Sequence, residues 1–314
     1  MLRLLGVSKK ILPKRLYDRG RSAVIGALEK KGFVRRLDAG PIDFRGLDIT
    51  PDDAFGRAAG IPCLIDVPCD KLRNFGPIMG WPCFPCEKGK GNPYVETIIQ
   101  YLDKGRVAYK DSKLKLYYDT FQPETVCDVF GFTNGSNFHH LMHRTALLVM
   151  PPWRAPLDDY YDVLEERKRY ILFENRLHGA EIGHEHGWAG YGPVSEKKGN
   201  LELNRLISIV DNIIANGYRV MAGADTVRVA VLRSGGEYRF LCNQGHHRTS
   251  ALAALGYKVA PASPRGPVID RADVLKLPGV VQSVYTPEQA LHVFDMLFEG
   301  RPPPAALRWT EAGA

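Results

Sequence analysis

The order of predicted elements after Asn200 constrains the fold of this chain more than any other feature of its sequence. Apolar residues at helical spacing predict a helix that begins at Asn200 and ends at Asn216-Gly217. Alternating side chains then predict two strands, Val227–Leu232 and Glu237–Cys242, which Ser234-Gly235-Gly236 joins as a hairpin. A second helix, His247–Leu255, follows the hairpin at once, and a short strand is predicted at 258–260.

Gly245 stands where the second strand of the hairpin meets the second helix. Glycine has no Cβ, so the backbone there can approach a ligand closely. Amide groups at a helix N-terminus point outward and carry partial positive charge, which favours an anion.

The residues after Gly245 add donors suited to phosphate. His246, His247 and Arg248 place two imidazoles and a guanidinium at one point, and arginine can bind two phosphate oxygens with its planar fork. Thr249 and Ser250 supply hydroxyl donors. We therefore predict that residues 245–250 bind the phosphates of a nucleotide. The alternative is an ordinary helix start at which Arg248 pairs with a carboxylate.

Residues 200–262 resemble the ParB/sulfiredoxin-like superfamily. Two blocks carry the resemblance: the helix Glu202–Gly217, through Ser208, Ile209 and Gly217, and Gly245-His246-His247-Arg248 followed by Ala251 and Leu255-Gly256. The Gly-x-x-Arg motif is the phosphate-contacting loop of that superfamily, which includes ATP-using sulfiredoxins, CTP-binding ParB proteins and kinases such as the free-serine kinases. The chain also looks like uncharacterised bacterial proteins often encoded near surface-polysaccharide genes.

Departures from the superfamily narrow what the resemblance implies. Sulfiredoxins carry a catalytic cysteine just before the His-Arg pair, where this chain has His246, and Cys242 lies on the strand side. ParB proteins carry an acidic-basic pair and then a helix-turn-helix domain, of which this sequence shows no clear pattern. The Gly-His-His-Arg form is most similar to the kinase-like members, which implies ATP or another nucleoside di- or triphosphate, with Mg²⁺.

A phosphotransferase also needs a carboxylate to position or deprotonate the acceptor. Glu202 begins the helix that borders the nucleotide in this superfamily, so we predict it as the base or Mg²⁺ contact, with Glu196 second. An acid in the first turn also complements the helix dipole, so a structural role for Glu202 stays open. Arg205 and Lys198 are predicted to contact substrate or to support the site. Pairing of Arg205 with Glu202, and solvent exposure of Lys198, are the alternatives.

Two further clusters allow a metal or a substrate contact. His184 and His186 lie in the Gly-rich stretch 179–199, which we expect to be a substrate-facing loop. Cys63, Cys69, Cys83 and Cys86 allow a zinc site, although the first spacing is looser than usual, and isolated buried cysteines are the alternative. The sequence predicts no ligand of a resident metal ion.

Charge is concentrated at one end of the chain. Residues 1–36 hold eleven basic and two acidic residues, so this segment carries +9 and the rest of the chain −2. The body is therefore not a general polyanion-binding surface, and nucleic acid is not an expected partner. The basic segment is either a helix on an anionic membrane face or a solvated helix packed on its own domain. The sequence has no long apolar run, so we expect a cytoplasmic protein, with membrane association through residues 1–36 as the exception.

These features predict an α+β protein with three parts. They are the basic segment 1–36, a mainly helical accessory or substrate region 37–178, and a nucleotide-binding domain 179–314 with its core at 200–262 and a C-terminal helix. The resemblance implies a small mixed sheet with helices in this last part. Residues 62–91, rich in Pro, Gly and Cys, are predicted to be largely loop.

The predicted function is phosphoryl transfer from a nucleotide to a hydroxyl of a small molecule or sugar. The resemblance adds a setting in surface-polysaccharide biosynthesis. The rival from another class is a non-catalytic, nucleotide-gated regulatory or DNA-binding ParB-like protein. A scaffold that docks on a membrane through its basic end is a third possibility.

Overall fold

The computed structural model describes residues 41–74, 82–132, 139–154, 160–220 and 226–312. Contacts divide the chain into residues 1–42 and residues 43–314, and the described helices and strands belong to the second unit, except for Ile42. The basic segment 1–36 and its predicted membrane contact lie outside the described residues. Within the described residues, no helix combines the length and apolar character needed to cross a membrane.

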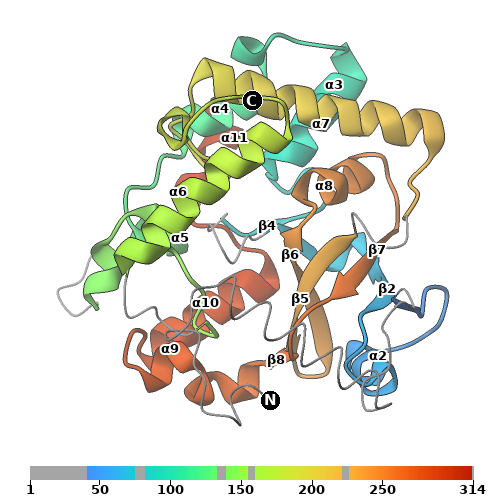
Figure 1. The fold of residues 1–314 in the computed structure, drawn as a ribbon, viewed down its shortest axis with the longest axis vertical. Helices are drawn as coiled ribbons and strands as arrows, with labels where there is room; N and C mark the ends of the chain where they lie inside the picture. The colour runs from blue at the N-terminus through green and yellow to red at the C-terminus, as the bar shows by residue number, and fades with distance from the viewer. Residues whose placement is uncertain (1–40, 75–81, 133–138, 155–159, 221–225, 313–314) are drawn as a thin grey trace, which may run out of the picture. The chain divides into compact units, whose positions relative to one another are not determined.

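The described strands form one eight-stranded mixed sheet (Figure 1). They are β1 (Ile42–Asp43), β2 (Cys63–Pro68), β3 (Leu72–Asn74), β4 (Phe84–Pro85), β5 (Val227–Ser234), β6 (Glu237–Gln244), β7 (Val259–Pro264) and β8 (Ile269–Asp270). From β2 onward the order is β2-β7-β5-β6-β3-β4, with β8 beside β5. The pairs β3–β6, β5–β7 and β5–β8 are parallel, whereas β2–β7, β3–β4 and β5–β6 are antiparallel.

The hairpin of β5 and β6 is the centre of this sheet, and its prediction is confirmed. Val227, Val229 and Val231 of β5 are fully buried. The turn uses Gly235 and Gly236 at φ +56° and +84°, which side chains disfavour.

The prediction that residues 62–91 are largely loop is wrong, because β2, β3 and β4 lie there. β2 is buried along nearly its whole length, so it lacks the apolar–polar alternation of a half-exposed strand. These strands pair with β7 and β6, so strands from both sides of residue 178 share one sheet. The mixed α/β character that we predicted is confirmed.

The helices predicted at 200–217 and 247–255 and at the C-terminal end are present, and the described part of the chain contains further α-helices. In chain order the α-helices are α2 (Pro51–Ala58), α3 (Pro93–Lys104), α4 (Lys113–Thr120), α5 (Val126–Phe130), α6 (Tyr160–Leu177), α7 (Glu196–Asn216), α8 (His246–Ala254), α9 (Pro278–Val281), α10 (Pro287–Glu299) and α11 (Arg308–Ala312). Short 3₁₀ helices lie at Cys69–Lys71, Tyr109–Asp111, His140–His143, Ala146–Leu148, His184–His186, Arg271–Lys276 and Pro304–Leu307.

Helix α7 begins earlier than the sequence predicts. Its N-cap is Ser195, whose side chain accepts from the backbone N–H of Lys198, so the predicted cap at Asn200 is wrong. Gly199 weakens helix propensity locally, but a Cβ there would lie 1.9 Å from the ring of Tyr109. This close packing requires a glycine inside the helix. Because α7 begins at Glu196, both Glu196 and Lys198 lie on the helix and not in a loop.

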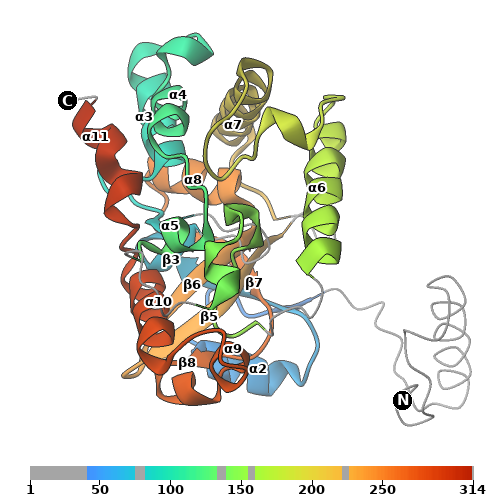
Figure 2. The same ribbon diagram turned by 90° about the vertical axis from the view of Figure 1, so that its left-hand side faces the viewer.

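Three helices lie over one end of the sheet. Figures 1 and 2 show α3, α4 and α7 gathered above the strands, with α8 between them and the sheet. Helix α8 contacts α3, α7 and the strands β5, β6 and β7. The start of α8 is thereby held between the sheet and the helical layer, next to α7.

Candidate functional site

The junction of β6 and α8 has the geometry that an anion-binding loop requires. Gly245 is the N-cap of α8 at φ +101°, a conformation that residues with a Cβ rarely adopt. A Cβ at this position would also come within 3.1 Å of Val227 Cγ2 and 3.2 Å of Arg248 Nη2. Among the described residues no side chain caps α8, so the amides of its first turn are placed as donors for a ligand.

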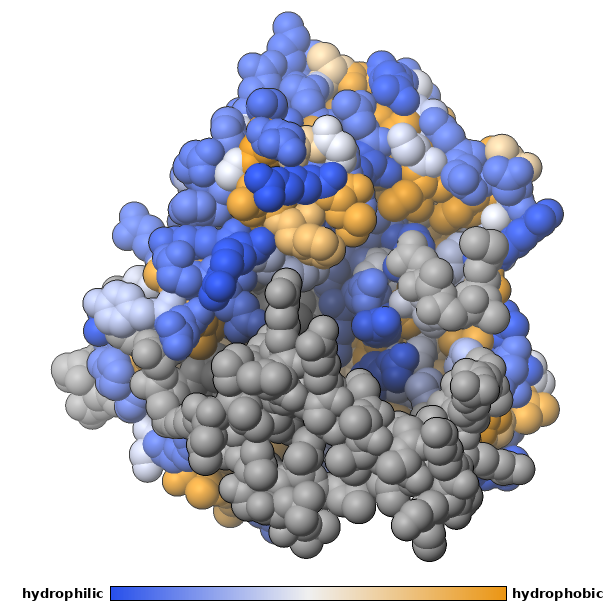
Figure 3. Space-filling view, in the orientation of Figure 1, coloured by the Kyte–Doolittle hydropathy of each residue, from blue (hydrophilic) through white to orange (hydrophobic). Residues whose placement is uncertain are grey.

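This junction forms the floor of the main cavity, which encloses about 650 Å³. Figure 3 shows a hollow in this face of the molecule, with hydrophilic residues at its floor and hydrophobic residues along its upper rim. The lining residues are Tyr170, Phe173, Glu174, Leu177 and His178 from α6 and the turn after it; Trp188 and Ala189; Leu201, Asn204, Arg205, Ser208 and Ile209 from α7; and residues 243–248 at the floor.

The two histidines of the floor are neutral at physiological pH. Burial lowers the pKa of His246 to about 3, with the charges of His247 and Arg248 acting in the same direction. Burial and the charge of Arg205 lower the pKa of His247 to about 4, although its hydrogen bond to Glu202 opposes the shift. The fixed positive charge at the cavity therefore comes from the guanidinium groups of Arg205 and Arg248.

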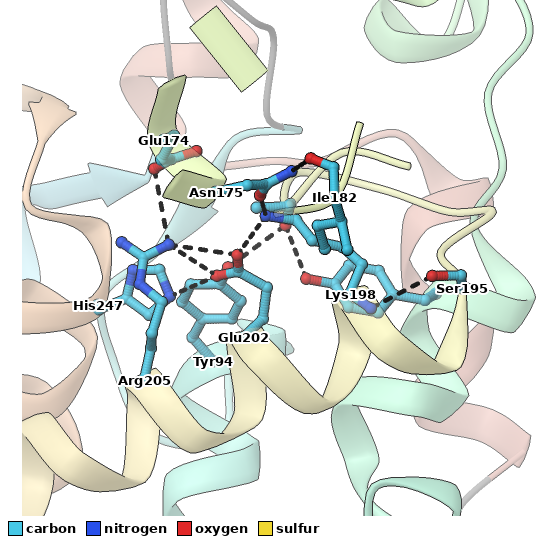
Figure 4. A network of polar contacts seen from close by, with 11 residues as sticks. Tyr94, Glu174, Asn175, Ile182, Ser195, Lys198, Glu202, Arg205 and His247 are labelled. Atoms are coloured by element: carbon cyan, nitrogen blue, oxygen red, sulfur yellow. Dashed lines mark hydrogen bonds and ion pairs between the residues drawn. The ribbon is translucent and has the colours of Figure 1, made fainter. Parts of the chain in front are cut away.

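Glu202 lies beneath the wall of the cavity and accepts hydrogen bonds from three side chains (Figure 4). Its Oε1 accepts from Lys198 Nζ at 2.6 Å, and Arg205 Nη1 lies 3.2 Å from both of its oxygens. His247 Nε2 lies 2.9 Å from Oε2, and since an ionised carboxylate only accepts, the proton is on Nε2. Burial alone would raise the pKa of Glu202, but Arg205 and His247 outweigh it and hold this pKa well below its usual value.

Lys198 connects Glu202 to helix α6. Both side chains are fully buried, and Lys198 Nζ also donates to Asn175 Oδ1 at 2.6 Å. Asn175 in turn donates to the carbonyl of Ile182 at 3.0 Å. Lys198 does not line the cavity, so it supports the site from behind and does not meet a ligand there.

These contacts do not favour the predicted role of Glu202 as the base. A carboxylate with such a low pKa has little basicity, and Glu202 is not among the described residues that line the main cavity. Its contacts instead fix the orientation of His247 and Arg205, both of which do line it. Glu196, the second candidate, is exposed in the first turn of α7 and also lies outside the cavity.

Four of the six predicted phosphate-binding residues line the cavity, namely 245–248. The other two, Thr249 and Ser250, are fully buried and face the sheet. Thr249 Oγ1 donates to Asn74 Oδ1 at 3.2 Å, and Asn74 Nδ2 donates to Ser250 Oγ at 3.0 Å. These hydroxyls therefore join α8 to β3. The sequence predicted neither β3 nor this contact.

The two loop histidines lie apart from the main cavity as well. His184 and His186 form a short 3₁₀ helix next to Glu185. His186 Nδ1 is 2.8 Å from the hydroxyl of Ser195, the residue that caps α7. His186 therefore supports the start of α7 through this contact.

The structure adds cavity residues that are not among the predicted site residues. Glu174, Trp188 and Asn243 all line the cavity, and each has a buried polar atom without a hydrogen-bond partner in the described part of the chain. Trp188 is only 7% exposed, and the next residue, Ala189, accepts from the hydroxyls of Tyr94 and Tyr118.

A sequence signal for Glu174 does exist. Tyr170, Phe173, Glu174 and Leu177 follow the i, i+3, i+4, i+7 spacing of one helix face. An aromatic and apolar stripe that contains one carboxylate is unusual on a helix otherwise rich in charge. That stripe is the cavity wall.

The zinc site that the sequence left open is not supported by the structure. All four cysteines are buried and free of disulfides. Cys83 donates to the carbonyl of Leu297 at 3.4 Å and Cys86 to Asn74 Oδ1 at 3.1 Å. The described residues contain no group of three or more His, Cys, Asp or Glu that could hold a metal ion.

Comparisons of the chain with protein-family models, with curated proteins and with solved structures found no match.

Proposed function

We propose that the main cavity binds the phosphates of a nucleotide at the start of α8, and that the protein transfers a phosphoryl group to a hydroxyl of a small molecule or sugar. One observation carries the proposal: the strand–Gly245–helix junction, with Arg248 beside it, forms the floor of a cavity. In this arrangement backbone amides and a guanidinium converge on one point, as phosphate binding requires.

The dimensions and lining of the cavity support a nucleotide-sized ligand. Its volume of about 650 Å³ lies within the usual range for small-molecule sites. The polar floor meets a wall that carries Tyr170 and Phe173 of α6, whose rings offer a surface for a base or a sugar. A ligand with a charged end and a flat, less polar end matches this division.

The ParB/sulfiredoxin-like fold is part of the same proposal. The order α7, β5, β6, α8, β7 supports it, because it reproduces the predicted sequence of helix, hairpin, Gly-His-His-Arg helix and strand. In this proposal Mg²⁺ enters with the nucleotide and neutralises charge on the phosphates. The surface-polysaccharide setting rests on the sequence resemblance alone.

Thermal unfolding in the presence of nucleotides tests the proposal. ATP, ADP, CTP and GTP are added with Mg²⁺ to the wild-type protein, to Arg248→Ala and to Arg57→Ala, an exposed control on α2. A ligand at about 100 times its dissociation constant stabilises the folded state by about 2.7 kcal/mol. We expect at least one nucleotide to raise the Tm of wild type and Arg57→Ala.

Loss of Arg248 removes a charge-assisted contact worth about 1.5–3 kcal/mol, so affinity falls roughly ten- to a hundredfold. The absence of a shift with every nucleotide would contradict the proposal. A shift that Arg248→Ala leaves unchanged would place the nucleotide elsewhere. Binding without transfer to any hydroxyl compound would favour the nucleotide-gated regulatory protein.

A further inference from the structure

We propose that Glu174, on the α6 wall of the main cavity, accepts the proton of the acceptor hydroxyl during phosphoryl transfer. This inference rests on the proposed function and deepens it, because it assigns the catalytic base to a residue that the sequence motif does not contain.

Glu174 lies where an acceptor would meet the nucleotide. It is the one carboxylate among the described residues that line the main cavity. It comes from α6, whereas the phosphate floor comes from α8, so acceptor and nucleotide phosphates can meet between the two walls. Its neighbours on the same helix face, Tyr170, Phe173 and Leu177, line the same wall and would place a flat acceptor against the carboxylate.

Glu174 can still accept a hydrogen bond from a ligand, whereas both oxygens of Glu202 already accept hydrogen bonds from neighbouring side chains. Glu174 Oε1 lies 3.7 Å from Arg205 Nη1, and its other oxygen, Oε2, is buried without a hydrogen-bond partner in the described residues. An unpaired buried oxygen is costly to a fold, so it is typical of a site that serves a ligand. The side chain is 19% exposed, against 0% for Glu202.

Electrostatics supports the same assignment. Burial and the charge of Glu202 raise the pKa of Glu174, and Arg205 and Lys198 only partly offset them. A raised pKa makes a carboxylate a stronger base, and therefore a better proton acceptor. Two carboxylates that share one guanidinium thus differ in the direction of their pKa shifts, which is a usual mark of divided roles.

With a nucleoside triphosphate as donor, the acceptor oxygen forms a bond to the terminal phosphorus, and its proton passes to the Glu174 carboxylate. The bond from that phosphorus to the bridging oxygen breaks, and its electron pair leaves with the nucleoside diphosphate. Glu174 then returns the proton to solvent. Arg205 Nη1 lies 3.7 Å from the Glu174 carboxylate, which helps to hold it in place before transfer.

Glu174→Gln tests the inference, because glutamine keeps the shape but cannot take a proton. Glu165→Gln, an exposed position earlier on α6, is the matched control. The nucleotide that stabilises wild type is used with water, glycerol and hexoses as acceptors, and phosphate release, transfer and nucleotide affinity are measured. We expect turnover in Glu174→Gln to fall about 100-fold or more while affinity changes less than about threefold. Glu165→Gln should match wild type.

A second variant separates a base from a structural residue. Glu174→Ala removes the carboxylate, and added formate, which is small enough to enter the gap, should restore part of the lost turnover. Turnover of Glu174→Gln near that of wild type would overturn the inference, as would a loss of Glu174→Ala turnover that formate does not restore. If wild type binds nucleotide but transfers to no acceptor, the inference falls with the transferase proposal. If wild type binds no nucleotide, the proposed function itself has failed, which the Arg248 experiment reveals separately.

Discussion

The inner face of α7 and the cavity face of α6 each present a glutamate to the same guanidinium, yet the two glutamates differ in almost every other respect. Glu202 on α7 is fully buried, accepts from Lys198, Arg205 and His247, and has a strongly lowered pKa. Glu174 on α6 borders the cavity, has Arg205 nearby at 3.7 Å, and has a raised pKa.

The difference shows that the number and kind of partners set the role of a carboxylate more than its place in a motif. A carboxylate with all of its lone pairs engaged organises its neighbours, because any proton transfer would break several contacts at once. A carboxylate with one free oxygen at a cavity wall can exchange partners. Glu202 thus holds the site together, and Glu174 is the one available to react.

The largest expected effect is on stability, from Glu202→Gln. The substitution leaves the ammonium of Lys198 and the guanidinium of Arg205 buried without their shared counter-charge, which costs roughly 3–5 kcal/mol. Urea unfolding should show this loss, while Glu196→Gln, exposed on the same helix, should stay within about 0.5 kcal/mol of wild type. Equal losses in Glu202→Gln and Glu174→Gln would remove the contrast between the two glutamates.

The next effect is the dependence of stability on pH, through His247. Its pKa is about 4 in the folded protein, below its unfolded value of 6.5, so the unfolded chain binds more protons between these limits. The free energy of unfolding should therefore fall as pH drops from 6.5 to 4, by as much as about 3 kcal/mol from this group.

His247→Asn removes this group and should flatten that part of the profile, while the contribution of His246 persists. Urea unfolding at a series of pH values measures both profiles. An unchanged slope in the variant would show that folding does not lower the pKa of His247.

A smaller effect is expected at Gly245. Alanine at φ +101° costs roughly 1–2 kcal/mol, and its Cβ would press on Val227 and Arg248. Gly256→Ala is the matched control, since it shares a positive φ of +80° but has nothing within 4 Å of a Cβ. Gly245→Ala should lose more stability and should also weaken nucleotide binding. Equal behaviour of the two variants would mean that the junction is not a close-packed ligand floor.

The smallest of these effects belongs to Ser195→Ala. Loss of the N-cap of α7 costs about 1 kcal/mol, because the backbone N–H of Lys198 loses its acceptor. Thermal unfolding measures this change. A Tm equal to that of wild type would show that the contacts of Lys198 and Glu202, and not the cap, fix the start of α7.

Local signals predicted one half of the fold and of the site. The β5–β6 hairpin, Gly245 and the start of α8 are adjacent in sequence, so alternation, turn residues and capping reveal them directly. Residues 245–248 of the cavity floor are accordingly among the predicted site residues, whereas the inward orientation of Thr249 and Ser250 was not predicted.

The other half depends on contacts between distant residues. β3 has only three residues, Leu72–Asn74, and it becomes a strand because β6 and β4 pair with it on either side. Lys198 resembles a solvated charge in the sequence, and only its contacts with Asn175 and Glu202 show that it is buried. The stripe of α6 that contains Glu174 can be read from the sequence, but only the fold shows that this face lines a cavity whose floor comes from α8.

A direct measurement of the two glutamate pKa values tests the central contrast most closely. Carbon-13 NMR of side-chain carboxyl groups in glutamate-labelled protein follows each titration, and Glu174→Gln and Glu202→Gln assign the signals by their loss. We predict that the carboxyl group of Glu174 titrates with a pKa above 4.5. The carboxyl group of Glu202 should stay ionised at the lowest pH at which the protein remains folded. A Glu174 that titrates at or below 4.5, or a Glu202 that titrates above it, would contradict the division of roles between the two walls.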